Sequence, residues 1–551
     1  MSEARMKIAD TIIKEYGEKR SGNRDQIEDE VRRIANPLGT NDHESDSSYA
    51  SEDEMFDTTV REARVTAING IMGSMFPPSN KWFSNKFVKI DETQDEQRHR
   101  DALEKVGDLQ FRQLGQDNFY IAMAEALADY LDFGTTNIRL RKGKRRFAHF
   151  QAVTKSKYKF QLDDEGFPDI VWVYHKLTAY ELKTMFGEKG LTQKVKDAID
   201  EEKYDEQFEV IHKIKRRSDF NPKNKGIRTP DPEKREYASW WVCKDDKDLL
   251  GNATIPRRKV IYEDGVYFNE YTIYRLMSRA GQSEGEGLTT MMLPAIRTAN
   301  SKAKNIEMAE NLKVNPPWYE DESNPLGDDA RLPGGTVNVD GFSSESQVGP
   351  VDLRGIDIDH EKMGLAEIRQ TIKTAFFNDA FKMFTNQDVA TNRKTAFESR
   401  LIKSEQQSLI TTIVYGLVEE GVKPLLGKHL DMMIQEGKVP QSIIDDLPEN
   451  YEIELTSQFA KSIDATRAQD LMTFIEFGLQ ADQIVPGTTK ATVKLPSALR
   501  KVALDLEIDV EDIYTAEESD EIFQKELDMQ RQMQESQIAA QAAGALGDLT
   551  G

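Results

Sequence analysis

The sequence predicts an α+β protein that is predominantly helical, and three observations support this class. Several long stretches repeat apolar residues every three or four positions, which is the spacing of amphipathic helices. The region 136–278 alternates apolar and polar residues in short runs separated by turn residues, as antiparallel strands do. Charged residues make up 31% of the 551 residues and hydrophobic ones 38%, a polar balance that favours long solvated helices over one compact globule.

The N-terminal part is expected to be helical. After a short helical pattern and an acidic, turn-rich segment, apolar spacing predicts a helix over 56–76, which Pro77 stops. A short apolar strand or turn follows at 82–88. A long helix is expected over 101–130, and Gly134 is placed to end it.

The region 136–278 is expected to be a β-rich, antiparallel module with small helical insertions. Turn residues at 163–166 and at Asp264-Gly265 separate several of its strands. Thr178 with Glu181 predicts a capping box that opens a short helix. The expected strands are Asn137–Leu140, Phe147–Val153, Tyr158–Leu162, Ile170–Tyr174, Phe208–Ile211, Tyr237–Cys243, Val260–Phe268 and Tyr271–Leu276.

Two helices that flank a loop-dominated insertion come next. The first is expected over 288–314, with a start near Pro294, a residue that suits the first turn of a helix. The insertion, 315–355, is rich in proline, glycine and acids. The second helix is expected over 357–379, with apolar residues at heptad-like spacing.

The C-terminal third contains the longest helical run in the sequence. Between Thr395 and Glu436 the only helix breaker is Pro424, which we expect to kink a helix about 63 Å long. Short strands and helices are expected over 440–515. A Gln- and Met-rich helical tail is expected from Glu517 onwards.

Motifs of enzyme chemistry are missing from the sequence. It contains no G-x-x-x-x-G-K-S/T phosphate loop and no G-x-S-x-G elbow, and its seven histidines form no ligand pair. We therefore expect no catalytic activity, no metal and no cofactor. Cys243 is the only cysteine, and the N-terminus lacks the apolar core of a signal peptide. No stretch approaches the ~18 apolar residues of a membrane helix, so we expect a protein made in the cytosol, with no membrane partner.

The formal net charge of -23 disfavours tight, stationary binding of DNA, because most non-specific affinity comes from cations that release counterions. Positive charge is instead sorted into local clusters. The two larger clusters comprise Arg139, Arg141, Lys142, Lys144, Arg145 and Arg146, and Lys213, Lys215, Arg216, Arg217, Lys223, Lys225 and Arg228. Two interpretations stay open for them: a solvated face that pairs with acids, also between subunits, or contact with phosphate groups.

The order of these parts resembles the head-to-tail connector, or portal protein, of short-tailed bacteriophages. Three segments carry the resemblance: FDTTVREARVTAINGIMGSMFPPSNKWF (56–83), NFYIAMAEALADYLDFGTTNIRL (118–140) and TIYRLMSRAGQSEGEGLTTMMLPAIRTANSKAKNIEMA (272–309). The sequence departs from the family at 281–287, where an acidic, Gly-rich run replaces the usual Tyr-Gly-Arg-Ser. The resemblance rests on pattern and order over most of the chain.

The resemblance implies a portal-type protomer that assembles as a dodecameric ring at one capsid vertex. Its parts would be a wing (1–287, with the β-rich module at about 136–278), stem helix 1 (288–314), a clip (315–355), stem helix 2 (356–379), a tunnel loop (380–394), a long kinked wing helix (395–439), a wing or crown region (440–515) and a C-terminal helical barrel or tail (516–551).

The implied function is a non-enzymatic conduit through which double-stranded DNA is packaged and ejected. The tunnel loop would place Lys382, Asn386, Arg393 and Lys394 in the DNA channel, with the three cations as weak phosphate contacts. The clip would present Trp318, Tyr319, Glu320 and Asp321 to the terminase large subunit and later to the tail adaptor protein. For the two aromatics a local packing role stays open as well. Major capsid and scaffolding proteins would be further partners, in the virion and, during assembly, in the host cytoplasm.

Other classes of protein fit the sequence less well. A tail adaptor or an internal ejection-core component is the main alternative, but either would lack the order of helix, insertion and helix. A nuclease or a motor subunit fails on the missing motifs. A helical scaffold or chaperone would not need the β-rich module.

Overall fold

A computed structural model describes most of the chain up to residue 456. The described residues are 2–18, 22–35, 55–87, 94–188, 190–218, 220, 231–244, 260–314, 318–319, 349–350, 357–379, 413–448, 451–456 and 529. The chain divides into a larger unit, Met1–Gly73 with Asn85–Glu452, and a smaller unit, Ser74–Ser84 with Ile453–Gly551. Within the described ranges, no helix combines the length and the apolar character needed to cross a membrane.

The main sheet of the larger unit is antiparallel and has the strand order β4-β5-β6-β7-β8. Its strands are β4 (Tyr158–Leu162), β5 (Pro168–Thr178), β6 (Gln207–Arg216), β7 (Tyr237–Cys243) and β8 (Val260–Val266). The predicted turn at 163–166 joins β4 to β5, where Asp163 N–H donates to the carbonyl of Phe167 at 2.8 Å. The predicted β-rich, antiparallel module is therefore confirmed.

A second antiparallel sheet has the strand order β3-β2-β9. Its central strand, β2 (Thr135–Lys142), pairs with β3 (Ala148–Ala152) on one side and with β9 (Tyr271–Arg275) on the other. The six residues from Thr135 to Leu140 are all buried. Of its buried polar side chains, Thr135 and Arg139 have partners in Gly285 and Glu270. The side chains of Thr136 and Asn137 have no hydrogen-bond partner among the described residues.

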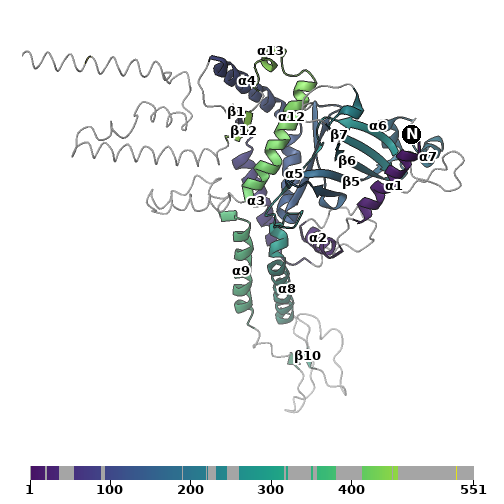
Figure 1. Cartoon of the computed structure of the whole chain (residues 1–551). Helices are drawn as coiled ribbons and strands as arrows, with labels where there is room; N and C mark the ends of the chain where they lie inside the picture. Colours follow the sequence, from purple (N-terminus) through teal and green to yellow (C-terminus); the bar gives the residue numbers. More distant parts are fainter. Residues whose placement is uncertain are drawn as a thin grey trace, which may run out of the picture. The chain divides into compact units, whose positions relative to one another are not determined.

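Alternation along the strands gives the main sheet two apolar faces. On one face Trp172 and Tyr174 of β5, with Ile211 and Val242, pack against the helix α1 (Ser2–Glu18) (Figure 1). The opposite face is covered by two short helices, α6 (Ala179–Phe186) and α7 (Gln193–Asp200), and by residues of β9. Cys243 is buried beneath α6 and α7.

The predicted capping box is present at the start of α6. The Thr178 side chain accepts a hydrogen bond from the backbone N–H of Glu181, and the Glu181 side chain accepts one from the backbone N–H of Thr178. Both donors would otherwise lack partners in the first turn of the helix.

A polar cluster joins the two sheets. His212 of β6 stacks on Trp241, with ring centroids 4.0 Å apart, and shares a 2.7 Å hydrogen bond with the hydroxyl of Tyr271 in β9. Burial lowers the pKa of His212 well below its usual value. Arg139 of β2 lies over the rings of Trp241 and Tyr271 and pairs with Glu270 at 2.7 Å.

The long helix expected over 101–130 is wrong as a single element. The structure contains two helices, α4 (Gln94–Gln116) and α5 (Phe119–Phe133). Between them, Asp117 Oδ1 accepts a hydrogen bond from the N–H of Ala148 (3.1 Å). Asn118 exchanges two hydrogen bonds with the backbone of Phe150 (2.7 and 3.0 Å). These side chains bind the edge of β3, which interrupts the helix where the apolar spacing gives no sign of a break.

Two further predictions of boundaries are wrong. Asp264-Gly265 is not a turn but lies inside β8, opposite Ser239 and Ala238 of β7. Glycine is needed there because a Cβ would lie 1.8 Å from the carbonyl oxygen of Pro232. The helix α8 covers the predicted range 288–314, but its start is at Leu288 and not near Pro294. Hydrogen bonds from its first turn to the preceding residues and to α5 fix that start.

The remaining described elements follow the expected order. They are α2 (Gly22–Ala35), α3 (Thr59–Met75), β1 (Phe83–Phe87), α8 (Leu288–Val314), β10 (Trp318–Tyr319), β11 (Gly349–Pro350), α9 (Ile358–Ala375), a π-helical turn (Leu417–Val422), α12 (Lys423–Gln435), α13 (Gln441–Ile444) and β12 (Tyr451–Leu455). In the smaller unit the rings of Phe76 and Trp82 pack edge to face, with centroids 5.0 Å apart.

Among the described glycines, Gly134, which ends α5, alone combines a positive φ with a close approach to another part of the backbone. Its φ is 73°, and a Cβ would lie 2.2 Å from a backbone carbon of Glu286. We predict that Gly134→Ala destabilises the larger unit by about 2–4 kcal/mol. Gly427→Ala is the matched control, because Gly427 lies inside α12 with nothing within 4 Å of an added Cβ. The control should stabilise by about 0.5–1 kcal/mol, and urea unfolding midpoints of the two variants measure both effects. Equal midpoints would contradict this prediction.

Candidate functional site

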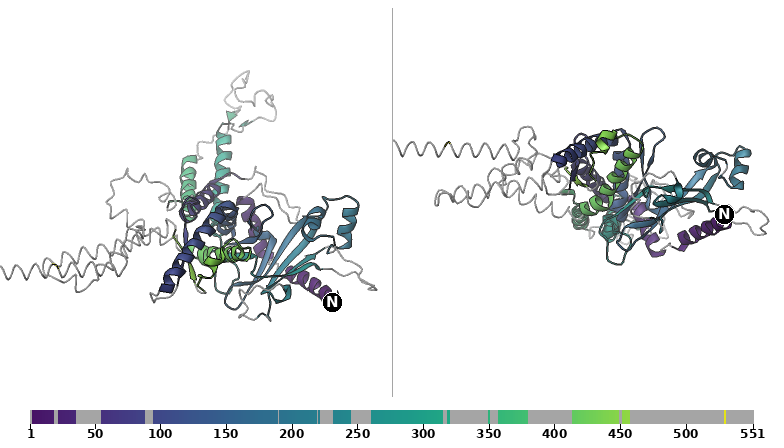
Figure 2. Two further views of the ribbon diagram at one scale, coloured as in Figure 1. Left: turned by 90° about the horizontal axis from the view of Figure 1, so that it is seen from above. Right: turned by 45° about the horizontal axis from the view of Figure 1, so that its top comes forward.

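Helices α8 and α9 run antiparallel and lie side by side, away from the sheets of the larger unit (Figures 1 and 2). Lys302 pairs with Glu361 at 2.7 Å, and Glu310 with Lys362 at 2.6 Å. Leu365 and Ile372 of α9 are buried, as are the residues of α8 up to Ile306 on its inner face. We call α8 and α9 together the helix pair.

The far half of the helix pair is exposed. After Ile306 no residue of α8 is buried, and four large apolar side chains are largely open to solvent. They are Met308 (50%), Leu312 (43%), Val314 (76%) and Met363 (69%). A single chain therefore leaves this part of the pair without an apolar partner.

The segment before α3 ties both helices of the pair to the rest of the larger unit. Asn300 Oδ1 of α8 accepts hydrogen bonds from the N–H groups of Phe56 and Asp57, at 2.7 and 3.2 Å. Arg369 of α9 donates to Asp57 Oδ2 at 2.8 Å, while Asp57 Oδ1 accepts from Thr59 N–H at 2.8 Å. Burial alone would raise the pKa of Asp57, but its bonds to Thr59 and Arg369 outweigh burial and lower it.

The start of α8 is fixed to the end of α5 by Asp132. The Asp132 carboxylate accepts 2.6 Å hydrogen bonds from Thr289 and Arg64, and its backbone carbonyl accepts one from Thr290 at 2.8 Å. Burial raises the pKa of Asp132, and the charge of Arg64 opposes this only in part. One turn earlier, burial and the charge of Asp132 raise the pKa of Asp129 to about 7.

The acidic, Gly-rich run at 281–287 connects β9 to α8, and at two of its glycines the space is too narrow for a side chain. A Cβ on Gly285 would lie 2.1 Å from the carbonyl oxygen of Gly134, and one on Gly287 would lie 2.2 Å from that of Asp132. Gly285 N–H donates to the hydroxyl of Thr135 at 2.9 Å. The backbone of this run therefore packs directly on the backbone of the α5–β2 junction.

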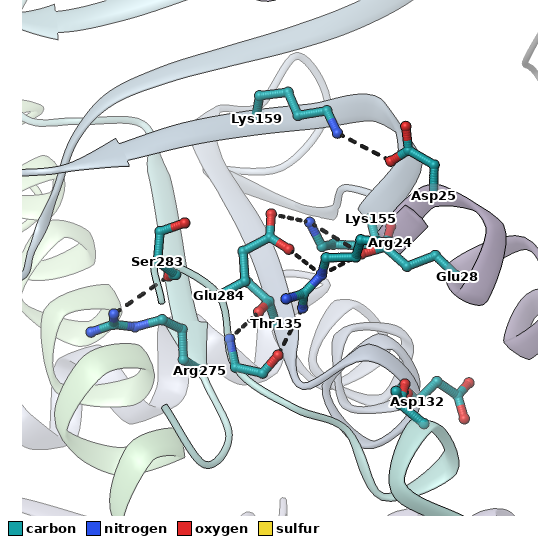
Figure 3. A network of polar contacts seen from close by, with 12 residues as sticks. Arg24, Asp25, Glu28, Asp132, Thr135, Lys155, Lys159, Arg275, Ser283 and Glu284 are labelled. Carbon is teal, nitrogen blue, oxygen red and sulfur yellow. Dashed lines mark hydrogen bonds and ion pairs between the residues drawn. The ribbon is translucent and has the colours of Figure 1, made fainter. Parts of the chain in front are cut away.

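Glu284, between these glycines, is the centre of a buried network of charges (Figure 3). It pairs with Lys155 at 2.8 Å and with Arg24 of α2 at 2.6 Å. Arg24 also reaches Glu28 at 3.1 Å and the carbonyl of Gly285 at 2.8 Å. The Lys155 side chain is only 1% exposed. Burial opposes ionisation of Glu284, but the charges of Lys155 and Arg24 outweigh it and lower the pKa of Glu284.

A π-helical turn binds to the other side of β9. Glu420 accepts three hydrogen bonds from Arg275: from the backbone N–H and Nε at 3.0 Å each, and from Nη2 at 2.7 Å. Gly421 lies against the ring of Tyr274, where a Cβ would come within 2.8 Å. Pro424 lies inside a helix that continues without a break from residue 413 to Gln435, at the passage from the π-helical turn to α12. Its missing backbone N–H therefore coincides with the irregular part of this helix.

Most of the predicted site residues lie outside the described part of the chain. These are Lys382, Asn386, Arg393 and Lys394 of the predicted tunnel loop and Glu320 and Asp321 of the predicted clip. Trp318 and Tyr319 form β10, which pairs antiparallel with Gly349–Pro350 of β11. The two ends of the insertion 315–355 are thereby brought together.

In both predicted basic clusters, the structure pairs some of the cations with acids and leaves others in different surroundings. In the first, Arg139 is buried against Glu270 and Lys142 pairs with Glu436 at 2.5 Å. Arg141, Lys144, Arg145 and Arg146 instead line a pocket. In the second, Lys213 pairs with Glu15 and Arg216 with Glu236. Its members Lys223, Lys225 and Arg228 lie outside the described residues.

Sequence reasoning missed Asp57, Asp132 and Glu284. Each is one acid among 96 Asp and Glu residues, and nothing in the local pattern separates a buried acid from an exposed one. The Gly-rich run around Glu284 was the one available signal. Nowhere in the described ranges do three or more His, Cys, Asp or Glu side chains come together as a metal site would require.

Comparisons with known proteins agree with one another. A family model described as "Bacteriophage head to tail connecting protein" matches residues 10–513. The chain is 21% identical over 419 residues to a "Probable portal protein" of Bordetella phage BPP-1, covering 76% of this chain and 72% of that relative. It is 22% identical over 435 residues to a "Portal protein" of Salmonella phage epsilon15, covering 77% of this chain and 74% of that relative.

Removing the charge of Glu284 should be among the costliest polar changes in the larger unit. Glu284→Gln leaves Lys155 buried without its closest counter-charge, so we expect a loss of about 3–5 kcal/mol of unfolding free energy. The double variant Glu284→Gln/Lys155→Met should recover part of this loss, because the unpaired ammonium is gone.

Glu436→Gln is the control for this cycle. It breaks the exposed pair with Lys142 and should change stability by about 0.5 kcal/mol or less. Chemical unfolding followed by tryptophan fluorescence compares the variants. A cost for Glu284→Gln as small as that of the control would show that the network does not fix the start of α8.

Proposed function

The chain belongs to the family of bacteriophage head to tail connecting proteins, and from this premise we propose how its parts carry out the function of a portal protein. Its role in the virion is structural: it connects the capsid to the tail at the capsid vertex, as part of an oligomer. The finer assignments below are inferences from the described residues and from the order of parts in the sequence.

The oligomer is proposed to be a ring of twelve copies, and the helix pair carries this proposal. A closed ring needs each copy to offer surfaces to its two neighbours. The far half of the pair provides apolar side chains that a single chain leaves exposed, among them Met308, Leu312 and Met363. Packing against neighbouring pairs would bury them, at a gain of about 25 cal/mol per Å² of apolar area. The pair would be the stem of the ring.

The insertion 315–355 is proposed to be the clip, with Trp318, Tyr319, Glu320 and Asp321 as contacts for the terminase large subunit and then for the tail adaptor protein. Aromatic side chains are enriched among the residues that dominate binding energy at interfaces. The pairing of β10 with β11 supports this assignment, because it closes the base of the insertion next to the helix pair.

The remaining parts are assigned by the same order. Residues 1–287 and 395–439 would form the wing, and the wing would contact the major capsid and scaffolding proteins. The region from 440 onwards would form the crown and the barrel. Assembly would take place in the host cytoplasm. Pro424, directly after a π-helical turn, is proposed to mark the bend of the long wing helix.

The tunnel loop is proposed to be 380–394, with Lys382, Asn386, Arg393 and Lys394 facing the DNA. Twelve copies would carry twelve times the formal charge of -23, so the channel as a whole would repel the duplex. Repulsion suits a conduit, since DNA that is not held can slide. The three cations would then be weak local contacts. A tail adaptor or an ejection-core component is not favoured, because both curated relatives above are named as portal proteins.

Mass measurement and negative-stain imaging of the purified chain test the ring. We expect particles with a mass near twelve times 62.7 kDa, with a central hole wide enough for duplex DNA, about 20 Å. The variant Met308→Ser/Leu312→Ser/Met363→Ser replaces three exposed apolar side chains with polar ones. It should reduce the fraction of chains in the ring and leave the fold of the single chain intact. A chain that stays monomeric at all protein and salt concentrations would contradict the ring.

Neutralising the predicted tunnel-loop cations tests their role separately. In Lys382→Gln/Arg393→Gln/Lys394→Gln we expect unchanged ring mass but poorer retention of packaged DNA. The slope of log retention against log salt concentration should decrease by up to about three, one for each lost phosphate contact. Lys183→Gln/Lys203→Gln/Lys234→Gln changes the net charge equally at exposed lysines that pair with neighbouring acids. Normal retention in the tunnel variant, equal to that of this control, would remove the assignment.

A further inference from the structure

Four cations lie at the end of the β2–β3 hairpin, and no described residue forms an ion pair with them. Arg141 lies in β2, and Lys144, Arg145 and Arg146 lie in the turn and are exposed. The charge of Glu270, which pairs with Arg139, also acts on Arg141. Lys142, in the same strand as Arg141, differs from these four because Glu436 neutralises it at 2.5 Å. In a chain with 23 more acids than bases, four cations without an ion-pair partner at the end of one hairpin are a local reversal of charge.

These cations surround a concave surface. Together with Asn118, Gly143 and His149 they line an open pocket of about 400 Å³. Asn118 cannot turn toward a ligand, because both polar groups of its side chain bind the backbone of Phe150. The cations, in contrast, have no such restraint. The Nε of Arg141 is buried and has no hydrogen-bond partner among the described residues.

The backbone of the turn gives the pocket a fixed shape. Gly143 N–H donates to the carbonyl of Phe147 at 2.9 Å. A Cβ on Gly143 would lie 2.2 Å from the carbonyl oxygen of Arg146, so the chain folds tightly back on itself here. The side chains of residues 144–146 are thereby held at the end of a paired β-hairpin, next to Arg141.

The electrostatics of the pocket favour an anion. Burial and the charges of Arg141, Arg139 and Arg146 lower the pKa of His149, so its imidazole is neutral at pH 7. Burial and the charge of Arg139 also lower the pKa of Arg141, and the charge of Glu270 opposes this only in part. An anion in the pocket would relieve this mutual repulsion and satisfy the free guanidinium donors.

The donor set suits phosphate groups better than single carboxylates. Three of the four cations are arginines, whose planar guanidinium groups bind phosphate oxygens with two parallel hydrogen bonds. A carboxylate satisfies one such group, whereas consecutive phosphates of a nucleic acid backbone present several anions to one short turn. We propose that the pocket formed by Arg141, Lys144, Arg145 and Arg146 binds backbone phosphates of duplex DNA. This site belongs to the β-rich module and does not depend on the ring or on the segment 380–394.

Fluorescence anisotropy with a labelled duplex of about 30 base pairs, titrated with the full chain between about 50 and 200 mM salt, tests this site. The pocket variant is Lys144→Gln/Arg145→Gln/Arg146→Gln, which leaves the partly buried Arg141 in place. We expect its affinity to fall about tenfold or more at the low salt concentration. The slope of log affinity against log salt should decrease by about three.

The matched control is Lys183→Gln/Lys203→Gln/Lys234→Gln, which has the same net charge as the pocket variant and lies in the same module. It should bind the duplex like the wild-type chain. Equal losses in both variants would mean that net charge alone sets the affinity and would overturn the site. A pocket variant that binds like the wild type would overturn it as well.

The mass of each sample is measured alongside. If the pocket variant alone loses assembly, the cations pair with acids of a neighbouring copy, and the proposal is wrong. A wild-type chain that binds the duplex through the pocket but forms no ring would contradict the proposed ring and leave the phosphate site standing. The two failures can therefore be told apart.

Discussion

The structure depends on a constraint that follows from burying charge. Lys155 is almost completely buried, and Asp132 is buried at the start of α8. A buried charge is tolerated only where its partners are in place. Lys155 requires Glu284, and Asp132 requires Arg64 and Thr289. Since these partners come from α3, α8 and the run before α8, the pairing fixes where the helix pair leaves the sheets.

The same constraint explains why glycines surround these charges. Glu284 can reach Lys155 only if the backbone on either side of it lies against the α5–β2 junction, and Gly134, Gly285 and Gly287 leave the room for this. The composition of the run at 281–287 therefore has a structural reason in this chain. Glu284 is the partner of the buried Lys155, and Gly285 and Gly287 leave the space for it.

The sequence predicted the helices and strands better than it predicted the contacts between distant side chains. Alternation located the eight strands that the structure describes in the β-rich module, and the capping box at Thr178 was correct, because these signals are local. The turn predicted at Asp264-Gly265 was wrong. The break between α4 and α5 could not be predicted, because Asp117 and Asn118 find their partners about 30 residues away in β3. Glu284, Asp132 and Asp57 were missed for the same reason. The basic cluster at 139–146 was recognised, but only the structure separates its paired members from the unpaired ones.

The pairing of β10 with β11 also has a consequence for which parts of the sequence can vary during evolution. Trp318–Tyr319 and Gly349–Pro350 hold the two ends of the insertion together. The distance between the ends of α8 and α9 therefore does not depend on the residues between β10 and β11. Lengthening a closed loop adds little to its closure entropy. If the insertion is the clip, as proposed, a change of length or sequence between β10 and β11 would alter the contact with a partner and leave the backbone pairing at its base in place.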